Sequence, residues 1–385
     1  MQAKAHNEHL DAVRAIAALL VLAANVRITV LVDFSELPVQ GLVEAAFYAV
    51  TSLGHVAVLT FFALSGYLVG GRALTVLRRG QWSWSSYLLR RLTRLWIVVL
   101  PALGLTWCLD LLSARLNSEG VSMFLEHFGL PQYDHSSATL IGNIFFLQTI
   151  LTPTFGSDAP LWSLANEFWY YLIFPLALVP FFDRRRWRLN AAVSAASLAL
   201  AAAILPLKLI LLGLIWLAGV AASMLAQTER LHAFLRHPGV RVVGLALIPA
   251  SIAYARLPGE LGQEFVLGLA MSAALPVLAH LPSFGAAYKA SAARLAGISY
   301  TLYLVHFPVI LFIVTVWITP HQWAFGPTGL AVFASVFAAA LAAAWGVWWL
   351  FERHTDAVYA ALSGRAASSR NGPLPGVGSP GAVDR

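Results

Sequence analysis

Two polar residues stand eleven positions apart in an apolar stretch near the beginning of the chain. The stretch is LDAVRAIAALLVLAANVR, residues 10–27, and the two residues are Arg14 and Asn25. In a helix this spacing is a rotation of about 1100°, so both side chains lie on one face, roughly 16 Å apart along the axis. A charge and an amide are costly in hydrocarbon, which favours a hydrated interior on that side. Alternatively, Arg14 reaches the lipid headgroups and Asn25 bonds a neighbouring helix.

Three further polar residues interrupt apolar segments. They are His55, Glu167 in PLWSLANEFWYYLIFP, and His306 in ISYTLYLVHFP. A buried histidine is commonly a structural hydrogen-bonding residue. A carboxylate in an aromatic, apolar stretch is costly unless a partner or water satisfies it, so such residues in membranes tend to mark sites or pathways. Together with Arg14 and Asn25, these residues predict a polar site inside the bundle.

Arginines and aromatic residues cluster in GGRALTVLRRGQWSWSSYLLRRLTRLW, residues 70–96. Guanidinium forks suit phosphate groups and indole faces can stack on a nucleotide base, so the cluster fits a phosphorylated, adenine-bearing cofactor such as coenzyme A. The alternative is an interfacial segment bound to anionic lipids. The arginines of interest are Arg72, Arg78, Arg79, Arg90, Arg91 and Arg94.

The composition requires a membrane environment for these residues. Of the 385 residues, 59% are hydrophobic and only 11% are charged, which excludes a soluble globular protein. The net charge of +7 comes mainly from arginines in short segments between apolar runs, and it indicates orientation in the membrane rather than binding to nucleic acid. We therefore expect an all-α polytopic bundle. The expected spans are 10–32, 43–70, 95–114, 163–182, 190–205, 207–226, 240–256, 263–281, 295–318 and 328–351.

One apolar stretch is ambiguous. ATLIGNIFFLQTILTPTF, residues 138–155, contains Asn143 and Gln148 before Pro153. If it crossed the membrane, the cluster DRRRWR at 183–188 would lie outside, against the positive-inside tendency. We expect the stretch not to cross, so that both termini are cytoplasmic. Residues 1–356 then form one membrane domain, and residues 357–385, rich in glycine, proline and serine, form a disordered cytoplasmic tail.

The single cysteine, Cys108, lies in an apolar run and excludes a disulfide. We expect neither a metal nor a thiol catalytic site. The sequence does not indicate the oligomeric state.

Six segments in order resemble the membrane-integral acyltransferase-3 family, which includes O-acetyltransferases of bacterial surface glycans. Each motif is weak alone, but the six in register are specific. They are LDAVRAIAALLVL at 10–22, FFALSGYLV at 61–69, RRLTRLWIVVLP at 90–101, WSLANEFWYYLIFP at 162–175, ISYTLYLVHFPV at 298–309 and FERHTD at 351–356.

The resemblance implies a multi-pass protein of the bacterial inner membrane that transfers an acyl group, often acetyl. The donor would be cytoplasmic acyl-CoA, and the acceptor a hydroxyl of a carbohydrate or glycolipid on the other side. The family pattern in the first helix is a basic residue followed eleven positions later by a histidine. Arg14 matches the first position, whereas Asn25 departs from the second. Histidine could take a proton from the acceptor, but an amide can only exchange hydrogen bonds.

The roles that this resemblance implies divide into three groups. Arg14, Arg72, Arg91 and Arg94 would bind the acyl-CoA phosphates; Asn25, Glu167 and His306 would be catalytic; His55, Tyr300 and Tyr303 would bind substrate. Asn25 would position the thioester while Glu167, or else a histidine, acts as the base. Ser65 and Gly66 would permit close packing of the second helix.

The departure at Asn25 leaves two further hypotheses open. The chain could bind acyl-CoA or glycan with little or no turnover. It could also move a glycan or lipid intermediate across the membrane on the same scaffold.

Overall fold

The computed structural model describes residues 7–182, 187–254, 261–319 and 321–364. Within these ranges the regular elements are helices, and the strand pairing is limited to isolated bridges such as Leu31 with Trp323. The α-helices are α1 (Glu8–Val30), α2 (Leu42–Thr51), α3 (Gly54–Ser65), α4 (Gly71–Arg78), α5 (Trp84–Leu116), α6 (Ser118–His127), α7 (Ser137–Ile144), α8 (Leu161–Phe182), α9 (Trp187–Ile204), α10 (Leu207–Ala226), α11 (Glu229–Arg236), α12 (Pro238–Tyr254), α13 (Leu261–Ala279), α14 (Ala286–Ile313), α15 (Pro327–Leu350) and α16 (Thr355–Leu362). Two π-helices, η2 (Gly66–Gly70) and η3 (Val314–Ile318), and two 3₁₀ helices, η1 (Phe34–Glu36) and η4 (Glu352–His354), complete the described elements.

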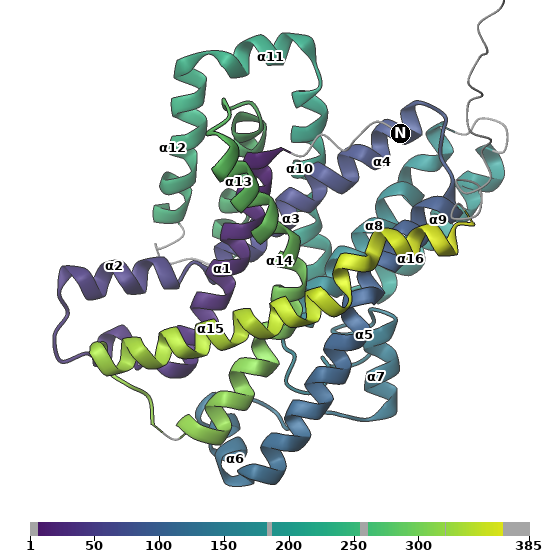
Figure 1. The fold of residues 1–385 in the computed structure, drawn as a ribbon. Coiled ribbons are helices and arrows are strands. Elements are labelled where there is room, and N and C mark those ends of the chain that lie inside the picture. Colours follow the sequence, from purple (N-terminus) through teal and green to yellow (C-terminus); the bar gives the residue numbers. More distant parts are fainter. Residues whose placement is uncertain (1–6, 183–186, 255–260, 320, 365–385) are drawn as a thin grey trace, which may run out of the picture.

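The expected spans correspond to helices in the structure. Among the described residues, nine helical segments are long and apolar enough to cross a membrane, and α12 is a shorter apolar helix at the position of the tenth expected span. The prediction of an all-α polytopic bundle is confirmed. Several helices extend beyond the expected bounds; α5 begins at Trp84 and α14 at Ala286. The second expected span is also not straight, because the helical run 42–78 turns at Ser52 and Leu53, so that α2 projects sideways from the bundle (Figure 1).

Helices α1 and α14 form the centre of the bundle and run parallel. His9 Nδ1 lies 3.1 Å from the Tyr288 hydroxyl near their first turns, and Asn25 Nδ2 lies 3.1 Å from His306 Nε2 further along. Helix α3 packs on α1, and α5 and α15 pack on α14. Arg14 and Asn25 therefore face packed helices, as expected for a polar face turned inward.

The second span packs on α10 through glycines. A Cβ at Gly66 would collide with the backbone carbonyl of Trp216, and a Cβ at Gly219 would collide with that of Ala63. The two backbones approach closely only because these side chains are missing. Gly66 also begins the π-helix η2, and π-helices are frequent at functional sites.

Segment 138–155 enters and leaves the bundle at the same end. Its helix α7 has eight residues, too few to cross, and the chain then turns back through left-handed backbone at Phe146 and Thr149. Asp110 Oδ2 accepts a hydrogen bond from His135, before the segment, and another from the Ser157 N–H, after it. Both ends thus meet at one residue of α5, in agreement with the expectation that the segment does not cross.

The expected tail begins in a helix. Helix α16 continues to Leu362, and its Tyr359 ring packs under the Arg90 guanidinium of α5 at 4.1 Å. The first residues of 357–385 are therefore attached to the bundle. The rest of the predicted tail, residues 365–385, lies outside the described residues.

Candidate active site

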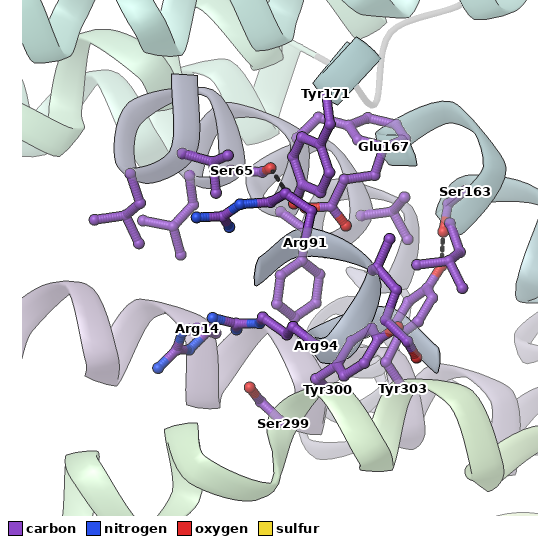
Figure 2. Close-up of a pocket in the computed structure, with 18 residues that line it drawn as sticks. Arg14, Ser65, Arg91, Arg94, Ser163, Glu167, Tyr171, Ser299, Tyr300 and Tyr303 are labelled. Atoms are coloured by element: carbon purple, nitrogen blue, oxygen red, sulfur yellow. Dashed lines mark hydrogen bonds between the residues drawn. The ribbon is translucent and has the colours of Figure 1, made fainter. Parts of the chain in front are cut away.

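A cavity of about 130 Å³ lies among α1, α3, η2, α5, α8 and α14, and we call it the arginine cavity (Figure 2). Its polar lining comes from five separate elements, so it exists only once the bundle is assembled. The residues that line it are Arg14, Val58, Phe61, Phe62, Leu64, Ser65, Leu68, Val69, Arg91, Arg94, Leu95, Ser163, Leu164, Glu167, Tyr171, Ser299, Tyr300 and Tyr303.

Three arginines give the cavity a positive character. Arg14 is paired with Asp11 at 3.0 Å, and the Arg14 and Arg94 side chains lie next to each other (Figure 2). The Arg91 guanidinium lies over the rings of Tyr87 and Tyr171, 5.8 and 5.7 Å from their centroids. The buried Nε atoms of Arg14 and Arg91 have no hydrogen-bond partner in the described part of the chain. Because buried donors are normally satisfied, these groups suit an anionic or carbonyl-bearing ligand.

Glu167 is the one carboxylate among the described lining residues of this cavity. Its Oε1 accepts a short hydrogen bond from the Tyr171 hydroxyl, which lies 3.2 Å from Ser65 Oγ. Ser65 in turn accepts a hydrogen bond from Trp216 Nε1 at 3.1 Å. This series of hydrogen bonds holds the Glu167 carboxylate in place at the cavity wall, where it can take up a proton from a bound hydroxyl.

Two tyrosines of α14 line the cavity opposite α5 and α8. The Tyr303 hydroxyl lies 2.6 Å from Ser163 Oγ at the beginning of α8, and the Tyr300 hydroxyl donates to the Leu95 carbonyl at 3.3 Å. Both rings are therefore fixed. The two rings form an apolar wall on the α14 side of the cavity.

Asn25 and His306 form a hydrogen-bonded pair outside this lining. The Asn25 amide donates to the Val21 carbonyl at 3.0 Å and to His306 Nε2 at 3.1 Å. His306 Nδ1 lies 3.0 Å from the Leu302 carbonyl, to which it must donate. Both ring nitrogens are thus engaged in the tautomer that this network requires. The Tyr303 ring, which lines the cavity, is 6.0 Å from the His306 ring.

A second cavity, of about 280 Å³, adjoins the first, and we call it the tryptophan cavity. It shares Val69 and Arg91 with the arginine cavity. Trp82 Nε1 is buried in it and has no partner in the described chain. The residues that line it are Val69, Arg72, Ala73, Val76, Gln81, Trp82, Ser83, Ser86, Tyr87, Arg90, Arg91 and Tyr359.

The two adjoining cavities combine arginine side chains, an indole and a fixed carboxylate within an apolar bundle. A family model described as "Acyltransferase domain", that of the acyltransferase-3 family, matches residues 7–349. The chain belongs to the acyltransferase-3 family. Among curated proteins and among solved structures, no match was found. The family supports a multi-pass membrane acyltransferase.

In this acyltransferase the structure brings together most of the residues that the sequence singled out, but not all. Arg14, Arg91, Arg94, Glu167, Tyr300 and Tyr303 line the arginine cavity, and Arg72 lines the tryptophan cavity. Asn25 and His306 bond each other instead of lining either cavity. His55 lies elsewhere, with half of its side chain exposed (51%), and is 2.9 Å from Glu264 of α13.

The sequence analysis missed several cavity residues of this acyltransferase, among them the polar residues Tyr171, Ser163 and Ser299. Tyr171 follows Glu167 by four residues, the spacing that places side chains on one helix face, so the signal was present. Ser163 is also four residues from Glu167, on the other side. No group of three or more metal-binding side chains occurs within the residues that the structure describes.

Proposed function

We propose that this acyltransferase moves an acyl group, acetyl in the first instance, from acyl-CoA to a hydroxyl of a surface or exported glycan. The observation that carries the proposal is the pair of adjoining cavities that share Arg91. The tryptophan cavity offers arginines and an indole for a phosphorylated nucleotide, and the smaller arginine cavity offers a carboxylate in its wall.

The donor would enter from the end of the bundle that carries the arginine-rich segments. By the positive-inside tendency this end is cytoplasmic, and the membrane is the bacterial inner membrane in this proposal. The nucleotide end would lie in the tryptophan cavity against Arg72, Arg90 and Trp82. The pantetheine arm would pass Arg91 and bring the thioester toward Glu167.

The reaction needs a group that accepts one proton from the acceptor hydroxyl and then donates it to the leaving thiolate. The acceptor hydroxyl attacks the thioester carbonyl, the new C–O bond forms, and the C–S bond breaks. Glu167 takes the hydroxyl proton and returns it to the departing thiolate, so that no net proton is consumed. Arg91, which interacts electrostatically with Glu167, stabilises the charge that develops on the carbonyl oxygen.

The test is acetyl-CoA binding and acetyl transfer by purified protein in lipid nanodiscs. We expect Arg91→Ala to weaken acetyl-CoA binding by about tenfold or more, because a charge-assisted contact is lost. Arg115→Ala, at the far end of the same helix α5, is the matched control and should bind like the wild type. Failure of the wild type to bind acetyl-CoA, or equal binding by both variants, would overturn the proposal.

A specific observation favours a second candidate, an acyl-CoA-binding protein with little or no turnover. At position 25 the chain has an amide, and the neighbouring imidazole of His306 has both nitrogens engaged. The amide cannot act as a base, and His306 could do so only if the pair were broken. If the wild type binds acetyl-CoA but is inert, and Asn25→His gains transfer, the second candidate replaces the first. If the wild type transfers acetyl and Asn25→His does not exceed it, the second candidate is excluded.

A further inference from the structure

A third cavity lies at the opposite end of the bundle from the arginine-rich segments, and we call it the outer cavity. Its volume is about 240 Å³. The residues that line it are Thr29, Met123, Phe124, Glu126, His127, Phe128, Val314, Ile318, Thr319, His321 and Gln322. They come from the end of α1, from α6 and the residue after it, from η3, and from the turn after η3.

Helix α1 passes both the outer cavity and the arginine cavity, and η3, which lines the outer cavity, continues α14, which lines the arginine cavity. Helix α1 contributes Arg14 to the arginine cavity and Thr29 to the outer cavity. Between them lies the pair of Asn25 and His306, and the Thr29 hydroxyl donates to the Asn25 carbonyl at 2.8 Å. The floor of the outer cavity is therefore one helical turn from this pair.

The walls of the outer cavity are fixed by hydrogen bonds between distant segments. Asn117 Nδ2 donates to the Thr315 carbonyl at 3.0 Å, which attaches α6 to η3. The Trp323 N–H donates to the Val30 carbonyl at 2.9 Å, and the Val32 N–H donates to the Trp323 carbonyl at 3.0 Å. These bonds attach the turn after η3 to the end of α1. The cavity is thus preformed, as ligand sites usually are.

The lining has the chemistry of a site for hydroxyl groups. It offers two threonine hydroxyls, two imidazoles, one carboxamide and one carboxylate beside phenyl rings. Gln322 Nε2 is held by the Ile28 carbonyl at 2.8 Å, which fixes the direction of its amide oxygen. The described lining contains no lysine or arginine, and Glu126 contributes a negative charge. An acidic ligand would meet repulsion there without a counter-charge.

We propose that the outer cavity binds the acceptor, as a sugar ring that carries no acidic group. The ring's hydroxyls would bond Glu126, Gln322 and the imidazoles, while its C–H face would lie against Phe128. The identification of this sugar as the acceptor rests on the proposed function. The preference for a sugar without an acidic group rests only on the residues that line the outer cavity. The hydroxyl to be acylated would reach Glu167 by displacing the pair of Asn25 and His306.

The experiment measures saccharide binding by saturation-transfer NMR on the purified full chain in nanodiscs. The probes are maltotetraose, cellotetraose and chitotetraose, which carry no acidic group, and tetragalacturonate, which is acidic. We expect at least one of the first three to bind and tetragalacturonate not to bind. Glu126→Lys should strengthen tetragalacturonate binding by about tenfold or more, because it replaces a repulsive charge with a charge-assisted contact. Glu119→Lys, on the same helix but outside the lining, is the matched control and should not.

Two results would overturn the inference: none of the three uncharged saccharides binds, or Glu126→Lys and Glu119→Lys behave alike. Acetyl-CoA binding is measured on the same samples. If the wild type binds a saccharide but does not bind acetyl-CoA, the result counts against the proposed function alone. Retained acetyl-CoA binding without saccharide binding would count against the outer cavity alone.

Discussion

Glu167 is the residue on which the proposed chemistry depends. Replacing it by glutamine keeps its size and one hydrogen-bond acceptor for Tyr171 but removes the base. We expect Glu167→Gln to lower the acetyl transfer rate by about 10²- to 10⁴-fold, with little change in acetyl-CoA affinity. The measurement is single-turnover transfer beside equilibrium binding.

Glu264→Gln provides the matched control for this change. Glu264 is also a carboxylate in an apolar helix, but it contacts His55 away from the cavities. Its variant should transfer acetyl at the wild-type rate. Equal loss in both variants would show that Glu167 supports the fold rather than the reaction.

Asp158 is a fully buried carboxyl group in the loop before α8, and both its oxygens lack partners in the described chain. Burial, and then the nearby charge of Asp110, raise the pKa of Asp158 well above its ordinary value. The folded state therefore holds this proton more tightly than the unfolded state. The resulting stability is complete below the ordinary pKa and is lost as the pH rises through the raised one.

Asp158→Asn removes this pH dependence. We expect its melting temperature, relative to the wild type, to rise from acid to neutral pH in scans of tryptophan fluorescence. Asp134→Asn is the control of opposite sign, because hydrogen bonds from Thr139 and Ser136 lower the pKa of the half-buried Asp134. The stability that ionised Asp134 contributes is lost as the pH falls through the lowered pKa of Asp134. A temperature difference for Asp158→Asn that is constant with pH would contradict the assignment.

At the scale of elements, the sequence predicted the helices better than their ends. Long apolar runs determine which segments become spanning helices, and hydropathy measures that directly. The turn at Ser52 and Leu53 and the helix α16 depend instead on contacts with distant segments. Tyr359, for example, packs under Arg90, more than two hundred residues away in the sequence. Such contacts leave no periodic signal in a single sequence.

The π-helix η2 depends on a missing side chain. Gly66→Ala would drive a methyl group into the Trp216 carbonyl, and because the Trp216 atoms it meets are backbone, they cannot move aside at low cost. We expect a loss of about 1–3 kcal/mol in unfolding free energy, the usual range for overpacking. The measurement is unfolding by denaturant in mixed micelles.

Gly104→Ala is the matched control for η2, because nothing lies within 4 Å of a Cβ at that position of α5. Alanine also has the higher helix propensity, so this variant should be as stable as the wild type or slightly more so. A similar loss in both variants would show that the close contact between η2 and α10 is unimportant.

At the scale of the whole molecule, the sequence predicted a polar interior but not how it is divided. Arg14 and Glu167 line one cavity, as expected. Asn25 and His306 instead satisfy each other across the contact of α1 and α14. Helical spacing shows which residues of one helix share a face, but it does not show which residue of another helix meets them. The pairing follows from the parallel register of α1 and α14, which only the packed structure defines.

The orientation of the whole bundle determines which side supplies the donor and which the acceptor. In a Cys108→Ser background we expect Arg79→Cys and His237→Cys to be protected from a membrane-impermeant maleimide in intact cells. Leu130→Cys and Ala159→Cys, which flank segment 138–155, should both be labelled, because both ends of that segment meet at Asp110. When the cells are opened, Arg79→Cys and His237→Cys should become labelled as well, and the labelling of the other two variants should not change. Labelling of Leu130→Cys without Ala159→Cys would mean that the segment crosses, and the arginine-rich end could then not supply acyl-CoA from the cytoplasm as proposed.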